Sequence, residues 1–272
     1  MAEGTVKNVL AVAGVDPSGG AGVLADVKTM SALGVYAAGV VTALTAQNTC
    51  AVTGVLPIPS EFVRSQIDTL FSDVRIDAVK IGMLGEADIV QTVAERLQFW
   101  RPRWIVLDPV MVAKSGDKLI SDKAVQMVVQ ELLPTASLVT PNLPEASVLL
   151  GRDVSRYEQM EQAARDIFSL SRERCSVLLK GGHLSDGTCR DMLFDGKKIV
   201  EFSAQRVNTV NTHGTGCALS SAVAALLAKT GDMNQAVSLA KDFITQAISA
   251  SDQLDVGHGN GPICHFVRLW KL

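Results

Sequence analysis

Short, predominantly apolar runs alternate with helical patterns along almost the whole chain of 272 residues. Clear examples of such runs are Ala78–Ile81 and Trp104–Leu107, and the pattern between them, at 87–99, is amphipathic. A strand that is apolar at every position needs cover on both of its faces, which is typical of parallel sheets. The alternation therefore predicts an α/β protein with a parallel sheet and helices on both sides.

The remaining pattern extends this expectation to the rest of the chain. Further strands are predicted at 9–14, 40–44, 138–140 and 177–179, and further helices at 21–32, 59–71, 122–133, 145–150, 158–170, 218–229 and 235–253. The helix at 59–71 should begin at Ser60 as its N-cap and bury Phe62, Ile67 and Leu70. Residues 192–202 predict a hairpin around Asp195-Gly196. Because no linker or repeat interrupts the pattern, we expect a single domain over residues 1–272.

Composition and charge exclude several classes of function. Hydrophobic residues make up 47% of the chain and the net charge is −3, so no basic patch for nucleic acid or an acidic membrane is expected. The five cysteines are widely spaced and form no CxxC pair, which favours reduced thiols over a disulfide framework. No apolar run has the length of a signal peptide or membrane span, so we expect a cytoplasmic protein.

Ligands of parallel α/β sheets bind beyond the carboxyl ends of the strands, so the segments that follow strands are the candidates for function. The first is "GVDPSGGAGVLAD" at 14–26, where glycines let the backbone approach a ligand and lead into a helix N-terminus. A tight strand-to-helix turn would explain the same glycines. The segment matches neither a Walker A loop nor a G-x-G-x-x-G fingerprint.

Three further segments carry charged or amide side chains. Asp108 ends the strand at 104–107 and suits either a hydrated Mg²⁺ ion or an Asp-Pro turn. Residues 113–119 that follow read as a mobile flap or a solvated loop. Asn142 and Glu145 open a helix, as site residues or as a cap. Lys180 precedes two glycines and suits a phosphate contact or a surface position.

The last segment, "NTHGTGCAL" at 211–219, places a thiol at an expected helix start. Gly214, Thr215 and Gly216 free the backbone, so several N–H groups can converge there as an anion hole. The helix dipole would lower the pKa of Cys217 and favour the thiolate. The alternatives are a small buried cysteine and a metal ligand, but His213 and Cys217 lack a second ligand pair.

Six segments together resemble a known family: "AGVDPSGGAGVLADVKTMSALGVYAAGVVTALTAQNT", "VKIGML", "VLDPVMVAKSGD", "TPNLPEA", "LLKGGHL" and "VNTHGTGCALSSA". They are similar, in the same order, to the bacterial hydroxymethylpyrimidine and phosphomethylpyrimidine kinases of thiamine biosynthesis, in the ribokinase-like superfamily. The resemblance implies a three-layer α/β/α fold with a mostly parallel sheet, usually as a homodimer. It also implies phosphorylation of 4-amino-5-hydroxymethyl-2-methylpyrimidine and then of its monophosphate, with ATP and Mg²⁺.

The same resemblance assigns residues. Gln47 should hydrogen-bond the pyrimidine ring. The residues expected to line the same pocket are Gly14, Asp16, Ala21, Met83 and Val110. Cys217 matches the proposed catalytic base and Gly214, Thr215 and Gly216 match the anion hole. Asn142, Glu145 and Lys180 match the nucleotide-phosphate and Mg²⁺ region, with Asp108 and Glu145 as the metal candidates.

Three other functions remain open. Relatives with the same cysteine-bearing motif phosphorylate pyridoxal or pyridoxine, and Met83 in the pocket would decide between the substrates. A non-catalytic regulator that binds the pyrimidine is a second alternative, although it would not need Asn142, Glu145 and Lys180 together. A cysteine hydrolase would need a His and an acidic partner for Cys217, for which no convincing pair is found.

Overall fold

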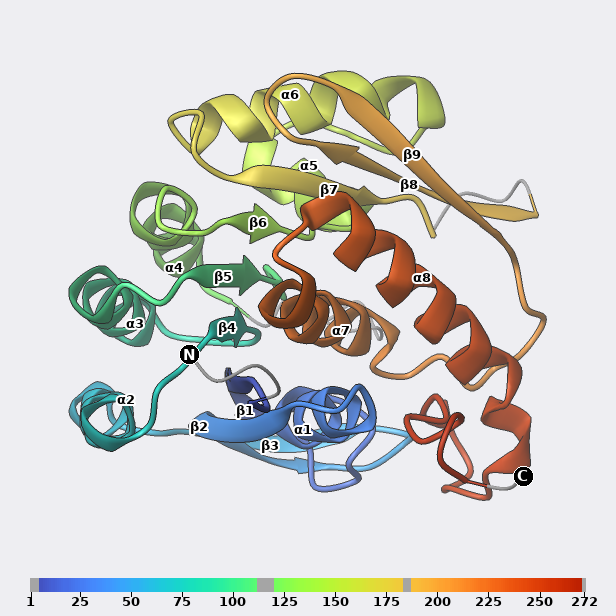
Figure 1. The fold of residues 1–272 in the computed structure, drawn as a ribbon, viewed down its shortest axis with the longest axis horizontal. Helices are drawn as coiled ribbons and strands as arrows, with labels where there is room; N and C mark the ends of the chain where they lie inside the picture. Colours follow the sequence, from blue (N-terminus) through green and yellow to red (C-terminus); the bar gives the residue numbers. More distant parts are fainter. Residues whose placement is uncertain (1–4, 112–119, 183–186, 271–272) are drawn as a thin grey trace.

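The computed structural model describes residues 5–111, 120–182 and 187–270. Within them lies one sheet of nine strands, in the order β3-β2-β1-β4-β5-β6-β7-β8-β9 (Figure 1). The strands are β1 (Asn8–Val15), β2 (Tyr36–Gln47), β3 (Val52–Pro57), β4 (Ala78–Ile81), β5 (Trp104–Leu107), β6 (Leu138–Val139), β7 (Ser176–Lys180), β8 (Thr188–Phe194) and β9 (Ile199–Gln205). The pairings from β2 through β7 are parallel, whereas β3, β8 and β9 are antiparallel to their neighbours.

Helices cover both faces of this sheet. They are α1 (Gly22–Ala32), α2 (Ser60–Asp73), α3 (Ala87–Trp100), α4 (Asp122–Met127), α5 (Leu143–Leu150), α6 (Met160–Leu170), α7 (Thr215–Thr230) and α8 (Met233–Ser249). Figure 1 shows α1, α7 and α8 on one face and α2, α3 and α4 on the other. The three-layer α/β/α architecture predicted from the sequence is therefore confirmed.

Strand β1 shows why the central strands are apolar at every position. Val9, Ala11 and Ala13 belong to the core beneath α1, α7 and α8, whereas Leu10 and Val12 belong to the core beneath α2 and α3. All five side chains are at most 1% exposed. Because successive side chains of a strand point to opposite faces, a strand covered on both sides needs an unbroken apolar run.

The ends of the sheet differ most from the sequence-based expectation. The strand expected at 40–44 extends over Tyr36–Gln47, and β3 was not predicted at all. Every residue of β3 is exposed, and the strand contains Gly54 and ends at Pro57, so it lacks the apolar pattern of a buried strand. Its structure depends on antiparallel pairing with β2. The hairpin predicted at 192–202 is confirmed as β8 and β9.

Two local expectations about helices were wrong. Ser60 is the first residue of α2 rather than its N-cap, which is Pro59 and forms no side-chain capping bond. Phe62 is 61% exposed, whereas Ile67 and Leu70 pack against the core as expected. The helix expected at 122–133 is α-helical only to Met127 and continues as a π-helical turn at Val128–Leu132.

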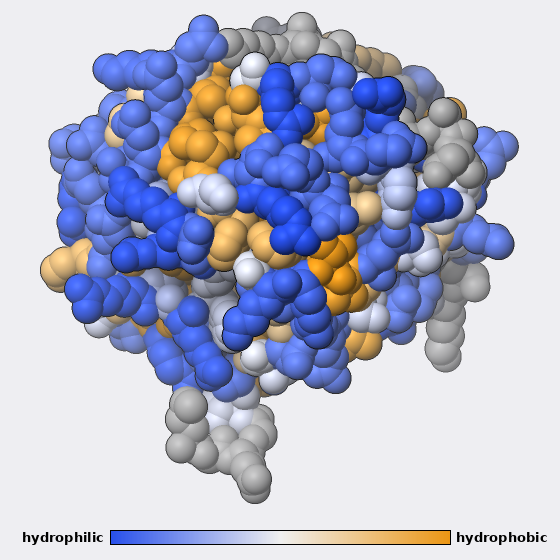
Figure 2. Space-filling view, turned by 90° about the horizontal axis from the view of Figure 1, so that it is seen from above, coloured by the Kyte–Doolittle hydropathy of each residue, from blue (hydrophilic) through white to orange (hydrophobic). Residues whose placement is uncertain are grey.

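In the face seen from above in Figure 2, hydrophilic residues predominate and smaller apolar areas lie between them. Of the helices in the described ranges, none combines the length and the apolar composition that crossing a bilayer requires.

The strand order reverses between β1 and β4, because β2 lies on one side of β1 and β4 on the other. Such a switch point opens a crevice at the carboxyl ends of the strands, where ligands bind in this class of fold. Two candidate residues end strands of the sheet, namely Gln47 in β2 and Lys180 in β7. The others come shortly after the ends of β1, β4, β5 and β6, and they are Asp16, Met83, Asp108 and Asn142. The flap expected at 113–119 lies outside the described residues.

Candidate active site

The glycine-rich segment after β1 is folded around the carboxylate of Asp16. Its Oδ1 accepts a hydrogen bond from Ser18 N and its Oδ2 one from Ala21 N, both at 2.9 Å. Gly22 has φ +58, and a Cβ there would lie 2.3 Å from the carbonyl oxygen of Gly14. The tight strand-to-helix turn that could explain these glycines is therefore present, and it leaves Asp16 buried at the end of the sheet.

Asp16 also joins this segment to the segment that precedes α7. The Nε2 atom of His213 lies 2.9 Å from Asp16 Oδ2. Burial alone would raise the pKa of the Asp16 carboxyl, but hydrogen bonds from His213 and Ser18 outweigh it, and the pKa is lowered from its ordinary value. Asp16 is therefore a carboxylate at neutral pH.

Most of the residues that the resemblance assigns to a substrate pocket lie around this carboxylate. Gln47, the last residue of β2, places its amide nitrogen 3.4 Å from His213 Nε2. A Cβ on Gly14 would lie 2.6 Å from the terminal carbon of Met83, so these two residues are in contact. Five of the predicted pocket residues, with Ala21 bonded to Asp16, are thus connected through the carboxyl ends of β1, β2 and β4.

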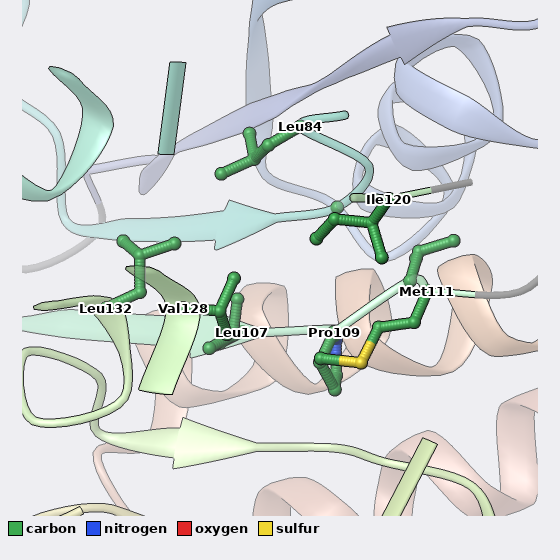
Figure 3. A pocket seen from close by; sticks show the side chains of 9 residues that line it. Leu84, Leu107, Pro109, Met111, Ile120, Val128 and Leu132 are labelled. Carbon is green, nitrogen blue, oxygen red and sulfur yellow. The ribbon is translucent and has the colours of Figure 1, made fainter. Parts of the chain in front are cut away.

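Val110 lies in a different environment. It lines a small cavity of about 10 Å³, whose other walls include Leu84, Leu107, Met111 and Ile120 (Figure 3). The cavity has room for about one water molecule, and its side chains are apolar. This space is a gap in the packing between the ends of β4 and β5 and the π-helical turn Val128–Leu132, and Gln47 is not among the residues that line it.

Helix α7 was expected at 218–229 and begins three residues earlier, at Thr215 within the glycine motif. Gly214 is the N-cap with φ +72, and a Cβ there would lie 1.8 Å from the carbonyl oxygen of Gly20, so only glycine fits. Thr215, Gly216 and Cys217 are the first three helical residues. The first N–H groups of a helix have no acceptor within it, and they carry the positive end of the helix dipole. An anion-binding corner results.

The thiol of Cys217 differs from the expectation. Burial raises its pKa to about 11, and the nearby carboxylates of Asp26 and Asp108 add to this, although the Lys80 ammonium opposes them. The predicted lowering of the pKa by the helix dipole is therefore wrong for the unliganded protein. The dipole contributes only about 0.3–2 kcal/mol, which is less than the cost of removing a thiolate from water here.

Beneath the start of α7 lies a cluster of buried charges. Lys180 Nζ is 3.0 Å from Asp108 Oδ1 and 3.9 Å from Glu145 Oε2. Thr140 donates to Asp108 Oδ1 at 3.1 Å and Ser220 to Oδ2 at 3.2 Å. A Cβ added to the neighbouring Gly216 would lie 3.4 Å from Lys180 Nζ. Lys180 is consequently a buried cation next to the anion-binding corner, not a surface lysine.

The two carboxyls of this cluster have opposite tendencies. Burial would raise the pKa of Asp108, but the ammonium groups of Lys180 and Lys80 and its hydrogen bonds outweigh burial, and its pKa is lowered. Burial raises the pKa of Glu145 to about 7, against the attraction of Lys180. Asp108 is therefore ionised near neutral pH, whereas Glu145 titrates there.

Asn142 and Glu145 also form the cap of α5. The Asn142 side chain accepts from Glu145 N and the Glu145 side chain accepts from Asn142 N, both at 2.8 Å. This reciprocal pair of hydrogen bonds is a capping box, so the expectation that these residues cap a helix is confirmed. It does not remove Glu145 from the charged cluster, since the same carboxylate faces Lys180.

One buried ion pair beside the site was missed from the sequence. Lys80 of β4 contacts both carboxylate oxygens of Asp26 of α1 at 2.8 Å, and Ser221 donates to Asp26 Oδ1 at 2.7 Å. Both charged side chains are 0% exposed. Lysine inside a four-residue apolar strand was the available signal, since a cation is rarely buried without a partner.

The carboxylates of this cluster fit a magnesium ion that is bound mainly by substrate phosphates and water, rather than one coordinated by protein ligands alone. No group of three or more His, Cys, Asp or Glu side chains in the described ranges could hold a metal ion. The oxygens of Asp108 already accept bonds from Lys180, Thr140 and Ser220. Mg²⁺ usually keeps several waters and binds through one or two carboxylates together with substrate phosphates. Asp108 and Glu145 can supply the carboxylates.

A helix start suited to an anion, a buried cation and the nearby Gln47 amide suit the transfer of a phosphoryl group to a small molecule, which requires positioning and charge stabilisation. The class that this fold and site define is the small-molecule kinase of ribokinase-like architecture.

Comparison with known proteins gives the family. The family model for phosphomethylpyrimidine kinase matches residues 16–264. The hydroxymethylpyrimidine/phosphomethylpyrimidine kinase of Salmonella typhimurium is 52% identical over 97% of this chain and 98% of its own. The chain belongs to the phosphomethylpyrimidine kinase family, which confirms the resemblance seen in the sequence.

Solved structures agree with the fold and add a second substrate class. The ADP complex of Bacillus subtilis pyridoxal kinase superposes with a TM-score of 0.89 at 34% identity, covering 97% of this chain and 100% of that one. Phosphomethylpyrimidine kinase from Clostridium difficile 630 has a TM-score of 0.79 at 38% identity, covering 89% of this chain and 99% of that one.

Proposed function

We propose that this protein transfers a phosphoryl group from ATP to 4-amino-5-hydroxymethyl-2-methylpyrimidine and then to its monophosphate, giving the diphosphate for thiamine biosynthesis. The observation that carries this proposal is 52% identity, over almost the full length of both chains, to a relative named for these two activities. The arrangement of Gln47, Asp16 and the start of α7 is what such a reaction needs.

The pyrimidine binds at the ends of β1, β2 and β4, where the Gln47 amide donates to and accepts from the ring edge. Its hydroxymethyl group points to the first turn of α7. The N–H groups of Gly216 and Cys217 hold the phosphoryl group in transfer, as an anion hole, and such donors are worth about 3–4 kcal/mol each in well-studied sites. Lys180 contacts the phosphates once they displace its present partners.

Magnesium, held with its waters by Asp108 and Glu145, would neutralise charge on the phosphates of ATP. Asn142 orients the Glu145 side chain through the capping box. The ionised state of Asp108 is maintained by Lys180. These residues place the charge of the nucleotide next to the anion hole.

Cys217 is the proposed base for the hydroxymethyl proton. With a pKa of about 11 it is a thiol at neutral pH in the unliganded protein, so it can accept the proton only if bound substrates lower that pKa. Phosphoryl transfer passes through a loose transition state that demands little of a base. The alternative role of Cys217 is to shape the anion hole through its N–H group and its small side chain.

Pyridoxal is the competing substrate, and the observation that favours it is the close structural likeness to pyridoxal kinase. One assay separates the readings. Purified protein receives ATP and Mg²⁺ with the hydroxymethylpyrimidine, its monophosphate or pyridoxal, each alone. Turnover of both pyrimidines is expected. Turnover of pyridoxal alone would overturn the proposal, and no turnover with any substrate would favour a non-catalytic pyrimidine-binding regulator.

The protein is further proposed to act as a single kinase domain and as a homodimer in the cytoplasm. The edge strand β3 supports a dimer, because Val55 and Leu56 are 52% and 62% exposed and Leu44, which pairs with Leu56 from β2, is 44% exposed. An exposed apolar edge strand invites pairing with a second chain. Leu56→Lys should convert a dimer to a monomer in sedimentation, and an unchanged mass would exclude this edge as the interface. The free cysteines fit a reducing compartment.

A further inference from the structure

The side chain of His213 has no part in the transfer chemistry, yet it lies between two residues of the pocket. Its Nε2 atom is 2.9 Å from Asp16 Oδ2 and 3.4 Å from Gln47 Nε2. At the other end of the same amide, Gln47 Oε1 is 3.2 Å from Thr45 Oγ1. Thr45 Oγ1 is in turn 2.8 Å from the carbonyl oxygen of Val15. A continuous polar chain thus runs from Asp16 to Val15 through Gln47.

The two ends of this chain determine which groups carry protons. A carboxylate is only an acceptor, so the Nε2 atom that faces Asp16 must carry a hydrogen. A backbone carbonyl is also only an acceptor, so the single hydroxyl proton of Thr45 is directed to Val15. The Nε2 atom of His213 therefore offers the Gln47 amide no acceptor, because its single hydrogen is directed to Asp16. The Thr45 oxygen offers the amide an acceptor but no proton.

An amide nitrogen toward His213 places a donor against a donor, and an amide oxygen toward Thr45 places an acceptor against an acceptor. Rotation of the amide by half a turn about its last bond removes both conflicts at the same separations. Nitrogen and oxygen of an amide are nearly equal in size, so hydrogen bonds decide their placement. We infer that His213 and Thr45 hold the Gln47 amide with its oxygen toward His213 and its nitrogen toward Thr45.

A fixed direction of the Gln47 amide affects substrate choice, a step that rests on the proposed function in which Gln47 meets the pyrimidine ring. One lone pair of the oxygen and one N–H of the nitrogen remain for the ligand. A 4-aminopyrimidine edge offers a donor, its amino group, beside an acceptor, its ring nitrogen. The 4-oxo analogue offers the reverse pair, with a carbonyl oxygen beside a ring N–H.

An amide that is free to rotate can form both hydrogen bonds with either the 4-amino or the 4-oxo ring edge. An amide whose direction is set by His213 and Thr45 can form both bonds with only one of these edges. With the hydroxymethyl group held at the start of α7, the ring cannot turn to compensate. His213 and Thr45 are thus positioning residues that make the pocket specific for the 4-amino ring. Rejection of the oxo ring follows from unpaired polar groups in a buried site, which is the strongest form of discrimination available to a pocket.

The direction of the amide is tested in the unliganded protein. Side-chain amide protons of Gln47, assigned by their loss in Gln47→Leu, should show stronger nuclear Overhauser contacts to the Thr45 methyl group than to the His213 ring protons. The opposite ranking would overturn the inference. This measurement needs no activity, so it decides the inference even if the wild-type protein proves not to turn over any pyrimidine.

The positioning role is tested by calorimetric affinities for 4-amino-5-hydroxymethyl-2-methylpyrimidine and its 4-oxo counterpart. The wild-type protein should prefer the amino compound by at least about 100-fold. His213→Leu and Thr45→Val should reduce this ratio by at least about tenfold, because the amide can then turn over. The matched variants His213→Gln and Thr45→Ser keep the donor and the acceptor, and should keep the ratio.

A residue that only supports the fold would affect these affinities differently from a positioning residue. If His213→Leu weakened both compounds equally, with the ratio intact, the residue would only support the fold and the positioning role would be refuted. The KM for ATP should stay within about twofold of wild type in every variant, since none contacts the phosphate region. Should His213→Leu fail to fold, Thr45→Val makes the same test from the other end of the amide.

Discussion

Removal of one partner from the Lys80–Asp26 pair should destabilise the protein severely. Asp26→Asn keeps the shape of the side chain but removes its charge and leaves the Lys80 ammonium buried, with both original side chains 0% exposed. Three hydrogen bonds of 2.7–2.8 Å converge on the carboxylate, so its loss leaves several polar groups poorly paired. Breaking a buried pair in this way costs about 3–5 kcal/mol, a large share of a typical total of 5–15 kcal/mol.

The charge state of Lys80 sets the pH range of this effect. Burial opposes the ammonium, but the Asp26 carboxylate outweighs burial and raises the pKa of Lys80 above its ordinary value of 10.5. A raised pKa means that the stabilisation is fully present below 10.5 and is lost only at more alkaline pH. The destabilisation by Asp26→Asn should therefore be the same at about pH 7 and about pH 8.

The assay is urea unfolding at 25 °C, with the slope of the transition compared between variants. The double variant Lys80→Met with Asp26→Leu replaces the pair by apolar groups and should recover most of the stability. As a control, Glu161→Ala breaks the exposed pair with Arg165 and should cost only about 0.3–0.5 kcal/mol. A double variant that loses the sum of the two single losses would refute the reasoning, because it would mean that the charges do not depend on each other.

Three other predictions concern the site. Cys217→Ala should lose most turnover while pyrimidine binding by calorimetry survives, and near-wild-type turnover would exclude the thiol as base. Because the pKa of Glu145 is raised to about 7 from 4.5, its folded form binds an extra proton between these values, and stability should fall as pH rises through that interval. Glu145→Gln preserves the capping box and should remove this fall, which amounts to roughly 3 kcal/mol in urea unfolding. Parallel stability curves for the two proteins would contradict the prediction. Gly214→Ala should cost more stability than the matched Gly151→Ala. Both glycines have a positive φ, for which a side chain costs about 1–2 kcal/mol, but only the Cβ at position 214 would collide with backbone atoms. Equal losses in thermal unfolding would contradict this clash.

Much of the site could be predicted because each part follows a strand. Ala78–Ile81 and Trp104–Leu107 were predicted with the bounds that the structure shows, since burial of both faces leaves an apolar run, which Lys80 interrupts in the first strand. The start of α7 was predicted from its glycines, which are needed where the backbone takes a positive φ. Strand β3 was not predictable in this way, because its pairing with β2 rather than its own pattern makes it a strand.

The sequence by itself determined the alternation of strands and helices, the family, and which side chains lie at the ends of the strands. Only the tertiary structure decided the chemistry of those side chains. Lys80 and Asp26 are 54 residues apart, and His213 and Asp16 are 197 residues apart, so no local pattern pairs them. The pKa of Cys217 moved opposite to the local expectation. Local backbone preference follows from neighbours in the chain, whereas charge, tautomer and amide direction follow from burial and from partners that only folding brings close.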